Sequence, residues 1–308
     1  MSYPRECRIG SMVLSPPWTN ASGFIATPPA YRRFAEYRTG GVVGKTVLLE
    51  AKPGHESPVF VEGEDGSFYN AIGLACPGAE EHAAEMKDVY PLRVSFIESV
   101  ASENSSDEVR RVIELLKGRF EAAELNVSCP NVSNRLLQVG QDPGLISEYT
   151  RAAKEAAGRK SLIVKLTPNV EDIIPPARAA ADAGADALLI ANTYGSLYIN
   201  PRTGKPHLTN QKGGRSGRNI MGDTLRLVNV VAGMRERHGF GFKIGGVGGI
   251  SCSSDVRAYF DAGADYVQFG THLFLDRPME MKRATQPELE TVKEFLERME
   301  MEIYGGEA

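Results

Sequence analysis

The sequence predicts a (β/α)8 TIM barrel that forms one domain over residues 1–308. Short β-rich apolar runs alternate with amphipathic helical patterns along the chain. The phrase DAGAD also occurs twice, at 182–186 and 261–265, each time between a helical pattern and an apolar run. Such repeated units imply parallel strands joined by right-handed crossovers. Eight parallel strands favour a closed barrel over an open, doubly wound sheet.

Seven runs have the composition of buried strands, and an eighth strand is expected near TNASG, at 19–23, to complete the barrel. In each DAGAD phrase the glycine supplies a left-handed cap for the preceding helix, and the next residues turn into the strand. In chain order the seven runs are 41–49, 92–97, 122–127, 162–166, 187–192, 242–246 and 266–270.

Two helices illustrate the pattern of the outer layer. One begins at Ser105 or Ser106, either of which can cap it, and ends at Gly118. Another is expected near 286–303 as an outer element. Each has one apolar face, formed by Val109, Val112, Ile113 and Leu116 in the first and by Leu289, Val292, Leu296 and Met299 in the second.

Two long segments, 129–144 and 193–221, show neither the helical nor the strand period. Loops of this length inside a compact domain are usually lids or binding loops. Both follow strands, so we expect both at the carboxyl-terminal face of the barrel, where such enzymes keep their chemistry.

Composition excludes several classes of function. The 308 residues are 42% hydrophobic and 24% charged, as in an ordinary soluble enzyme, and the net charge of −4 predicts no nucleic-acid partner. Residues 1–10 lack the apolar core of a signal peptide, and no window is apolar enough to span a membrane. The cysteines lie far apart without a C-x-x-C pair, which predicts no metal site and a cytoplasmic location; they are Cys7, Cys76, Cys129 and Cys252.

Polar side chains gather at the carboxyl ends of four apolar strands. One lysine alone is more often a rim residue that reaches water, but four polar groups at equivalent depth favour a planar, polar cofactor across the barrel mouth. Because alternate strand residues point inward, we expect Lys45 beside Val43 and Val47, Asn126 beside Glu124 and Ser128, Lys165 beside Ile163 and Thr167, and Asn192 at the end of its strand.

Glycines follow the last two strands. The run IGGVGGI spans 244–250, and GTHLF begins at Gly270. The ordinary alternative is a pair of tight turns, but barrel enzymes often bind phosphate between these two loops. The candidates are Gly248, Gly249, Gly270 and Thr271. The run is not a dinucleotide fingerprint, because it comes late in the chain and lacks G-x-G-x-x-G.

Cys129 lies just after an expected strand, in the stretch AELNVSCPNVSN. A single cysteine is more often a small buried hydrophobic residue. Its polar neighbours and its place in a loop favour a reactive thiol, either a nucleophile or a general base.

The order of motifs resembles the class 1 dihydroorotate dehydrogenases. NASG, GKT, NAIGL, NVSCPN, VKLTPN, ANT, GGRSG, GVGGI and QFGT occur in that family's order over residues 20–271. The resemblance implies a TIM barrel with one FMN that oxidises (S)-dihydroorotate to orotate in pyrimidine biosynthesis. It therefore implies a flavoprotein oxidoreductase acting on a CH–CH group.

The resemblance also assigns residues to roles. Cys129 is similar to the base that removes the C5 proton. The implied substrate residues are Lys45, Asn70, Gly73, Leu74, Asn126, Asn131, Asn192 and Thr193. The implied FMN residues are Ala21, Ser22, Lys45, Thr46, Asn126, Lys165, Ser216, Gly217, Gly248, Gly249, Gly270 and Thr271. Cys76 departs from the family, whose members often carry asparagine there.

Alternatives remain open at this point. The nearest is a dihydropyrimidine dehydrogenase-type enzyme; others are a flavin-binding subunit without its own activity and a phosphate-sugar barrel without flavin. The stretch 203–217 resembles the NAD-linked branch more than the fumarate-linked one. We expect a homodimer, with an iron–sulfur flavoprotein as a further partner, because the chain has neither an iron–sulfur cysteine cluster nor a nicotinamide fingerprint.

Overall fold

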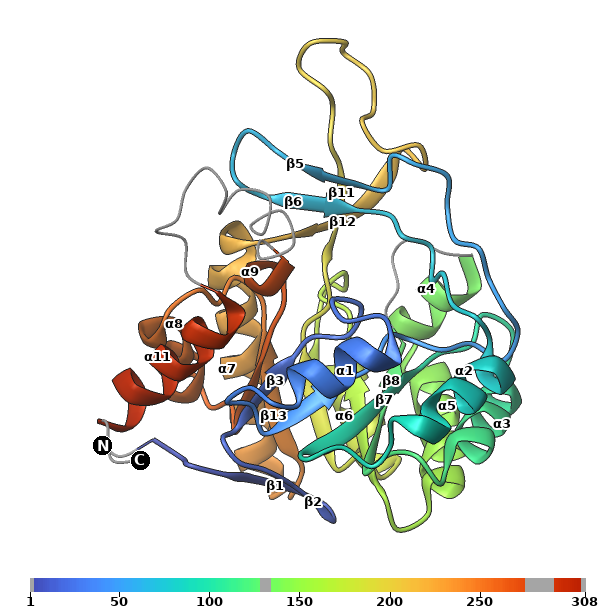
Figure 1. Ribbon diagram of the computed structural model, residues 1–308, viewed down its shortest axis with the longest axis vertical. Coiled ribbons are helices and arrows are strands. Elements are labelled where there is room, and N and C mark those ends of the chain that lie inside the picture. The colour runs from blue at the N-terminus through green and yellow to red at the C-terminus, as the bar shows by residue number, and fades with distance from the viewer. Residues whose placement is uncertain (1–2, 128–133, 275–290, 306–308) are drawn as a thin grey trace.

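The computed structural model describes residues 3–127, 134–274 and 291–305. Its centre is a closed barrel in which every described strand pairs in parallel with its neighbours, as predicted (Figure 1). Around the barrel the strands are β10 (Ala187–Ile190), β13 (Lys243–Val247), β14 (Tyr266–Phe269), β3 (Trp18–Asn20), β4 (Gly41–Val43), β7 (Ser95–Val100), β8 (Ala122–Asn126) and β9 (Ser161–Lys165).

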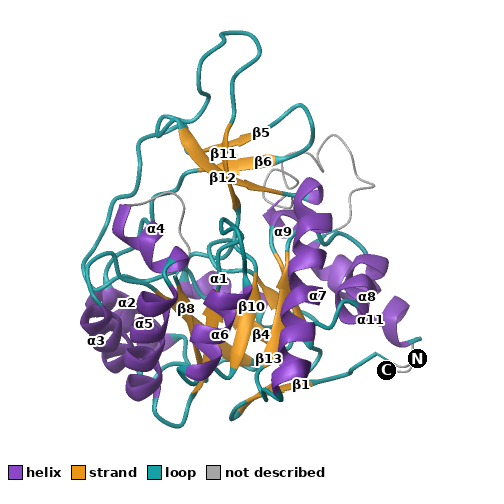
Figure 2. Ribbon diagram, turned by 180° about the vertical axis from the view of Figure 1, so that it is seen from behind, coloured by secondary structure: helices purple, strands orange, loops and turns teal. Residues whose placement is uncertain are grey.

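Helices cover the outside of the barrel. Figure 2 shows α2, α3 and α5 on one flank and α7, α8 and α11 on the other. None of the described helices combines the length and the apolar character that a membrane crossing requires. The helices are α1 (Pro28–Phe34), α2 (Ala79–Glu85), α3 (Ser106–Leu116), α4 (Asn134–Gln141), α5 (Pro143–Ala157), α6 (Ile174–Asp182), α7 (Met221–His238), α8 (Ser253–Asp261), α9 (Thr271–Phe274) and α11 (Val292–Tyr304), with short 3-10 turns η1 (Met86–Asp88) and η2 (Arg218–Ile220).

The predicted α3 is confirmed. Ser105 caps it by accepting a hydrogen bond from the backbone N–H of Glu108. The apolar face packs against the barrel, with Val109, Val112, Ile113 and Leu116 all buried. In α11, Leu296 and Met299 are likewise buried, whereas the first part of the expected helix, including Leu289, lies outside the described residues.

The repeated DAGAD phrase joins helices to strands as expected. Gly184 has φ 97° and Gly263 has φ 103°, which only glycine adopts readily. The last aspartate of each phrase accepts a backbone N–H from the neighbouring strand, at 2.7 Å for Asp186 and 2.8 Å for Asp265. The repeat therefore stabilises both a turn and the amino-terminal edge of the sheet.

A hairpin closes the amino-terminal end of the barrel. It consists of β1 (Cys7–Ile9) and β2 (Met12–Leu14), and its side chains pack into the barrel interior. The hydroxyl of Ser161 donates to the carbonyl of Ile9 at 2.6 Å and anchors the hairpin to β9. The opposite, carboxyl-terminal end is where a cavity remains.

Two strands differ most from their expected bounds, and the others differ by one to three residues at their ends. Regular pairing of β4 with β7 ends at Val43 and resumes only at an isolated parallel bridge between Val47 and Val100, so β4 is shorter than 41–49. Val47 belongs to a different core cluster from Val43. β7 is displaced toward the carboxyl terminus of the expected 92–97 and contains Glu98, which is fully buried. A buried hydrogen bond from His82 compensates that carboxyl group, so the strand continues through it.

The expectation that 193–221 is one irregular loop is wrong. The segment contains β11 (Tyr194–Leu197) and β12 (Lys212–Ser216), which pair with each other and, through β12, with the hairpin of β5 (Phe60–Glu62) and β6 (Phe68–Asn70). We call these four strands the upper sheet. Figure 1 shows it above the barrel mouth. The segment 129–144 also contains regular structure, namely α4 and the start of α5, while 129–133 lie outside the described residues.

Candidate active site

A cavity of about 350 Å³ lies at the carboxyl ends of the strands, between the barrel and the upper sheet. Every predicted site residue that the structure describes lines it. Two predicted residues, Cys129 and Asn131, lie outside the described residues. The lining residues that the sequence predicted are Ala21, Ser22, Lys45, Thr46, Asn70, Gly73, Leu74, Asn126, Lys165, Asn192, Thr193, Ser216, Gly217, Gly248, Gly249, Gly270 and Thr271.

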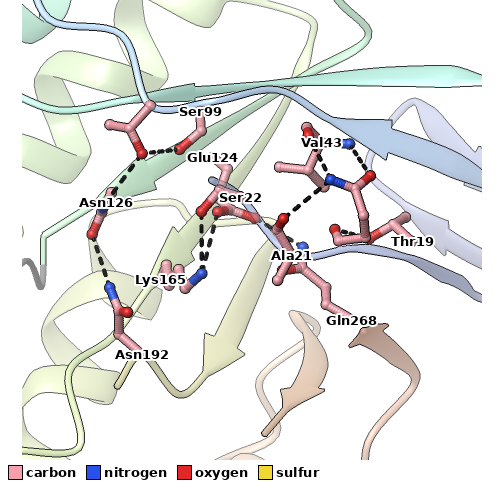
Figure 3. Close-up of polar contacts among 12 residues, drawn as sticks. Thr19, Ala21, Ser22, Val43, Ser99, Glu124, Asn126, Lys165, Asn192 and Gln268 are labelled. Atoms are coloured by element: carbon pink, nitrogen blue, oxygen red, sulfur yellow. Dashed lines mark hydrogen bonds and ion pairs between the residues drawn. The ribbon is translucent and has the colours of Figure 1, made fainter. Parts of the chain in front are cut away.

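A chain of hydrogen bonds orients the amides on one side of the cavity. The Nδ2 of Asn192 donates to the Oδ1 of Asn126 at 3.3 Å, and the Nδ2 of Asn126 donates to the Oγ1 of Thr46 at 3.4 Å (Figure 3). Thr46 in turn contacts the hydroxyl of Ser99 at 2.9 Å. Because Asn192 also accepts the N–H of Thr193 at 2.8 Å, both ends of its amide are fixed.

Lys165 is a buried cation at the floor of the cavity, not a rim residue that reaches water. Only 4% of it is exposed, and its Nζ donates to the hydroxyl of Ser22 at 3.2 Å. The Nζ lies 3.9 Å from the Oε1 of Glu124, whose other oxygen accepts from Gln268 at 2.9 Å (Figure 3). Glu124 compensates the buried charge, while the ammonium still faces the cavity.

The glycines after β13 are there for two reasons. Gly248 has φ 133° and Gly249 has φ 71°, conformations that side chains with a Cβ disfavour. A Cβ on Gly249 would lie 2.7 Å from the Cβ of Met221 and 3.0 Å from the carbonyl oxygen of Gly217. Glycine is therefore needed both for the positive φ of the turn and for its close packing against Met221 and Gly217. The loop also lines the cavity, so its backbone N–H groups can contact an anion.

The loop after β14 meets the upper sheet at the same end of the cavity. The Oγ1 of Thr271 donates to the hydroxyl of Ser216 at 2.9 Å. Ser216 is at the end of β12 and only 9% exposed. This contact brings hydroxyls and backbone groups from three loops together with Gly248 and Gly249.

The NAIGL motif forms the far wall. Gly73 and Leu74 both have positive φ, 77° and 57°. A Cβ on Gly73 would lie 2.9 Å from the ring of His55, so this turn is tightly packed from behind. Asn70 is the last residue of β6 in the upper sheet, and its Nδ2 donates to the carbonyl of Gly214 in β12 at 3.3 Å, so the upper sheet continues directly into this wall.

Sequence reasoning missed part of the lining. The walls include Phe24, Phe68 and Ile250, whose residue types carry no motif. Arg218 also lines the cavity; it forms an ion pair with Asp255 and donates to the carbonyl of Gly249 at 3.4 Å. The second arginine of GGRSGR was the available signal for this residue, because arginine often contacts phosphate.

Comparisons with known proteins agree on one family. The family model described as dihydroorotate dehydrogenase matches residues 7–292. The chain is 36% identical over 259 residues to the dihydroorotate dehydrogenase B (NAD(+)) catalytic subunit of Methanocaldococcus jannaschii, covering 82% of each chain. It is 34% identical over 298 residues to the protein of the same name from Alkaliphilus oremlandii, covering 96% of this chain and 94% of the relative.

Proposed function

The chain belongs to the dihydroorotate dehydrogenase family, and on that premise we propose how its cavity oxidises (S)-dihydroorotate to orotate with FMN. The reaction removes two hydrogens from a CH–CH bond in pyrimidine biosynthesis, so the protein is an oxidoreductase. The main support for this proposal is that two oriented amides, Asn126 and Asn192, line the same cavity as the buried Lys165.

The cavity fits FMN. Its donors and acceptors suit the polar edge of a flavin ring: the ammonium of Lys165, the hydroxyl of Thr46 and the hydroxyl of Ser22. The glycine turn at Gly248 and Gly249 suits the phosphate, because no Cβ blocks the approach to its N–H groups. When bound, FMN supplies the acceptor for the hydride that leaves C6 of the substrate.

Cys129 is proposed as the general base. Its thiolate removes the proton from C5 of the substrate, since a thiol with an ordinary pKa of about 8.5 is basic enough once well placed. In the sequence, Cys129 comes three positions after Asn126, the last residue of β8 and one of the two oriented amides.

The asparagines and Lys45 are proposed to bind the substrate. Each amide can both donate and accept, so Asn70, Asn126, Asn131 and Asn192 match the imide edges of a dihydropyrimidine. The ammonium of Lys45, which lines the cavity, is proposed to bind the carboxylate that distinguishes dihydroorotate from dihydrouracil.

The electron acceptor is proposed to be NAD, reached through a partner flavoprotein. The relatives named above are catalytic subunits of NAD-linked enzymes, which implies a second subunit. Affinity purification from the native host, followed by identification of the co-purifying chain, tests the partner. The predicted homodimer is tested by the molar mass of the purified chain in light scattering.

Anaerobic reduction of the bound flavin tests the substrate. Dihydroorotate should bleach the visible absorbance of the FMN-loaded protein, whereas dihydrouracil should leave it unchanged, because a site built on hydrogen bonds rejects analogues that lack a partner group. Equal bleaching by both compounds would instead support the dihydropyrimidine dehydrogenase-type alternative. Release of FAD, or of no flavin, from the denatured protein would contradict the cofactor.

A further inference from the structure

Tyr259 of α8 lies directly behind the glycine turn, on the side away from the cavity. It is fully buried, and its hydroxyl donates to the carbonyl oxygen of Gly248 at 2.7 Å. The ring packs on the backbone of β13, because a Cβ on Gly246 would lie 2.2 Å from its Cδ1. Burial raises the pKa of Tyr259, so the hydroxyl stays protonated and remains a donor.

This hydrogen bond fixes the orientation of one peptide plane. The bond between Gly248 and Gly249 is not among the cis peptides of the chain, so its C=O and N–H point in opposite directions. A carbonyl held toward Tyr259 therefore directs the N–H of Gly249 away from Tyr259, to the side where both glycines line the cavity. Within the described part of the chain, no residue accepts a hydrogen bond from this N–H.

The peptide needs such an anchor. Two consecutive glycines have a wide choice of backbone conformations, and both adopt positive φ here. Without a partner for the Gly248 carbonyl, the plane can rotate and turn the Gly249 N–H away from the cavity. A preorganised N–H contributes more to binding than one that must first be ordered.

We propose that Tyr259 is a positioning residue for the phosphate of the cofactor, because it holds the Gly248 carbonyl and thereby presents the Gly249 N–H to the phosphate. The inference rests on the proposed binding of FMN. It extends that proposal by naming how this chain distinguishes a flavin with a phosphate from one without it.

The test compares FMN with riboflavin, which lacks the phosphate. Flavin is removed from the full-length protein, and the dissociation constants of both compounds are measured by fluorescence. The parent protein should bind FMN more tightly than riboflavin. Tyr259→Phe keeps the ring that packs on Gly246, and should weaken FMN about tenfold, the effect of one lost hydrogen bond to a charged group, while riboflavin affinity changes less than about twofold.

Tyr266→Phe is the matched control. Tyr266 is a fully buried tyrosine whose hydroxyl has no hydrogen-bond partner among the described residues, so the same chemical change frees no peptide there. It should leave the ratio of the two affinities at the parent value. The ³¹P resonance of bound FMN should move in Tyr259→Phe and not in Tyr266→Phe.

The possible results distinguish a failure of the role of Tyr259 from a failure of FMN binding. If the parent protein prefers FMN and Tyr259→Phe keeps the same preference, the role of Tyr259 is wrong and FMN binding stands. If the parent protein binds neither flavin, or binds both equally, the phosphate site itself is wrong and both proposals fall.

Discussion

Among single residues, the buried pair of Lys165 and Glu124 is expected to affect both the free energy of unfolding and the rate of flavin reduction, and the two effects can be measured separately. Lys165→Met leaves Glu124 buried without its cation, which should lower the free energy of unfolding by about 3–5 kcal/mol. It should also slow flavin reduction, because a cation that offsets developing negative charge is lost. Urea unfolding and anaerobic stopped-flow measure the two effects.

A double variant serves as the control. Lys165→Met combined with Glu124→Gln removes both charges, so most of the lost stability should return. Flavin reduction should stay slow, because the cation is still missing. If the double variant recovered the parent rate of reduction, Lys165 would have only a structural role.

The second prediction for a single residue concerns Cys129 and the rate of flavin reduction. Cys129→Ala should still bind FMN and orotate, while reduction of the flavin by dihydroorotate falls by about 10²–10⁴, the usual effect of losing a general base. Cys129→Ser should be slow near neutral pH and recover as pH rises, since a hydroxyl is a much weaker acid than a thiol. Parent-like reduction in the alanine variant, or a covalent thioether found by mass spectrometry, would contradict a base.

A third prediction concerns how pH changes the stability of the fold through His82. Its ring is buried against Glu98, with Nε2 at 3.1 Å from the carboxylate. Burial alone would lower the pKa of His82, and the positive charge of Arg119 lowers it further. The hydrogen bond and the charge of Glu98, together with the charge of Glu85, outweigh both effects and raise the pKa above its ordinary 6.5. The pKa of Glu98 is also raised, in this case by burial, which outweighs the opposing effect of His82, so both groups bind protons more tightly in the folded chain.

Stability should therefore decrease with rising pH. The contribution of His82 is complete below about pH 6.5, the pKa in the unfolded chain, and is lost as pH rises through the higher pKa of the folded state. His82→Gln removes this contribution, so the unfolding free energies of parent and variant should converge as pH rises above about 6.5. Urea unfolding at several pH values measures both curves. If the unfolding free energies of parent and variant instead differed by a constant amount as pH rose, the protonation of His82 and Glu98 would not change on unfolding.

At the scale of elements, the sequence predicted most barrel strands because apolar runs and the DAGAD joints repeat locally. β7 was displaced because a buried glutamate in a strand is recognisable only with its partner, and His82 lies 16 positions before Glu98. The upper sheet was missed because its strands are only three to five residues long and β11 and β12 contain glycine. Its central pairing joins Phe68–Asn70 to Gly214–Ser216, a contact that no local period encodes.

The turn after β13 gives the prediction at this scale. Gly249→Ala must accept φ 71° and a Cβ at 2.7 Å from that of Met221, so it should lose about 1–3 kcal/mol of stability and most of its FMN affinity. Gly233→Ala is the control. It lies within α7 with open space around its Cβ, and should stabilise the protein by about 0.5–1 kcal/mol while binding FMN normally. Similar effects of the two substitutions would contradict a special turn.

At the scale of the whole molecule, the cavity depends on closure of the barrel. Its lining follows β3, β4, β8, β9, β10, β13 and β14, so residues far apart in sequence meet only when the circle of strands is complete. The sequence could predict which residues stand at strand ends, because motif and strand end coincide. It could not predict Phe24 or Phe68, since an apolar wall is defined only by what packs opposite it.

This dependence on closure predicts that FMN stabilises the entire fold. A ligand that binds only the closed barrel adds RT ln(1 + [FMN]/Kd), about 2.7 kcal/mol at one hundred times Kd. For a chain of 308 residues each kcal/mol moves Tm by about 2 °C, so saturation should raise Tm by about 5 °C. Calorimetry should show one transition that moves upward with the logarithm of FMN concentration. A Tm that ignores FMN at such excess, or a transition that splits so that only part of the molecule shifts, would mean that the cofactor contacts a local surface and not residues gathered from around the barrel.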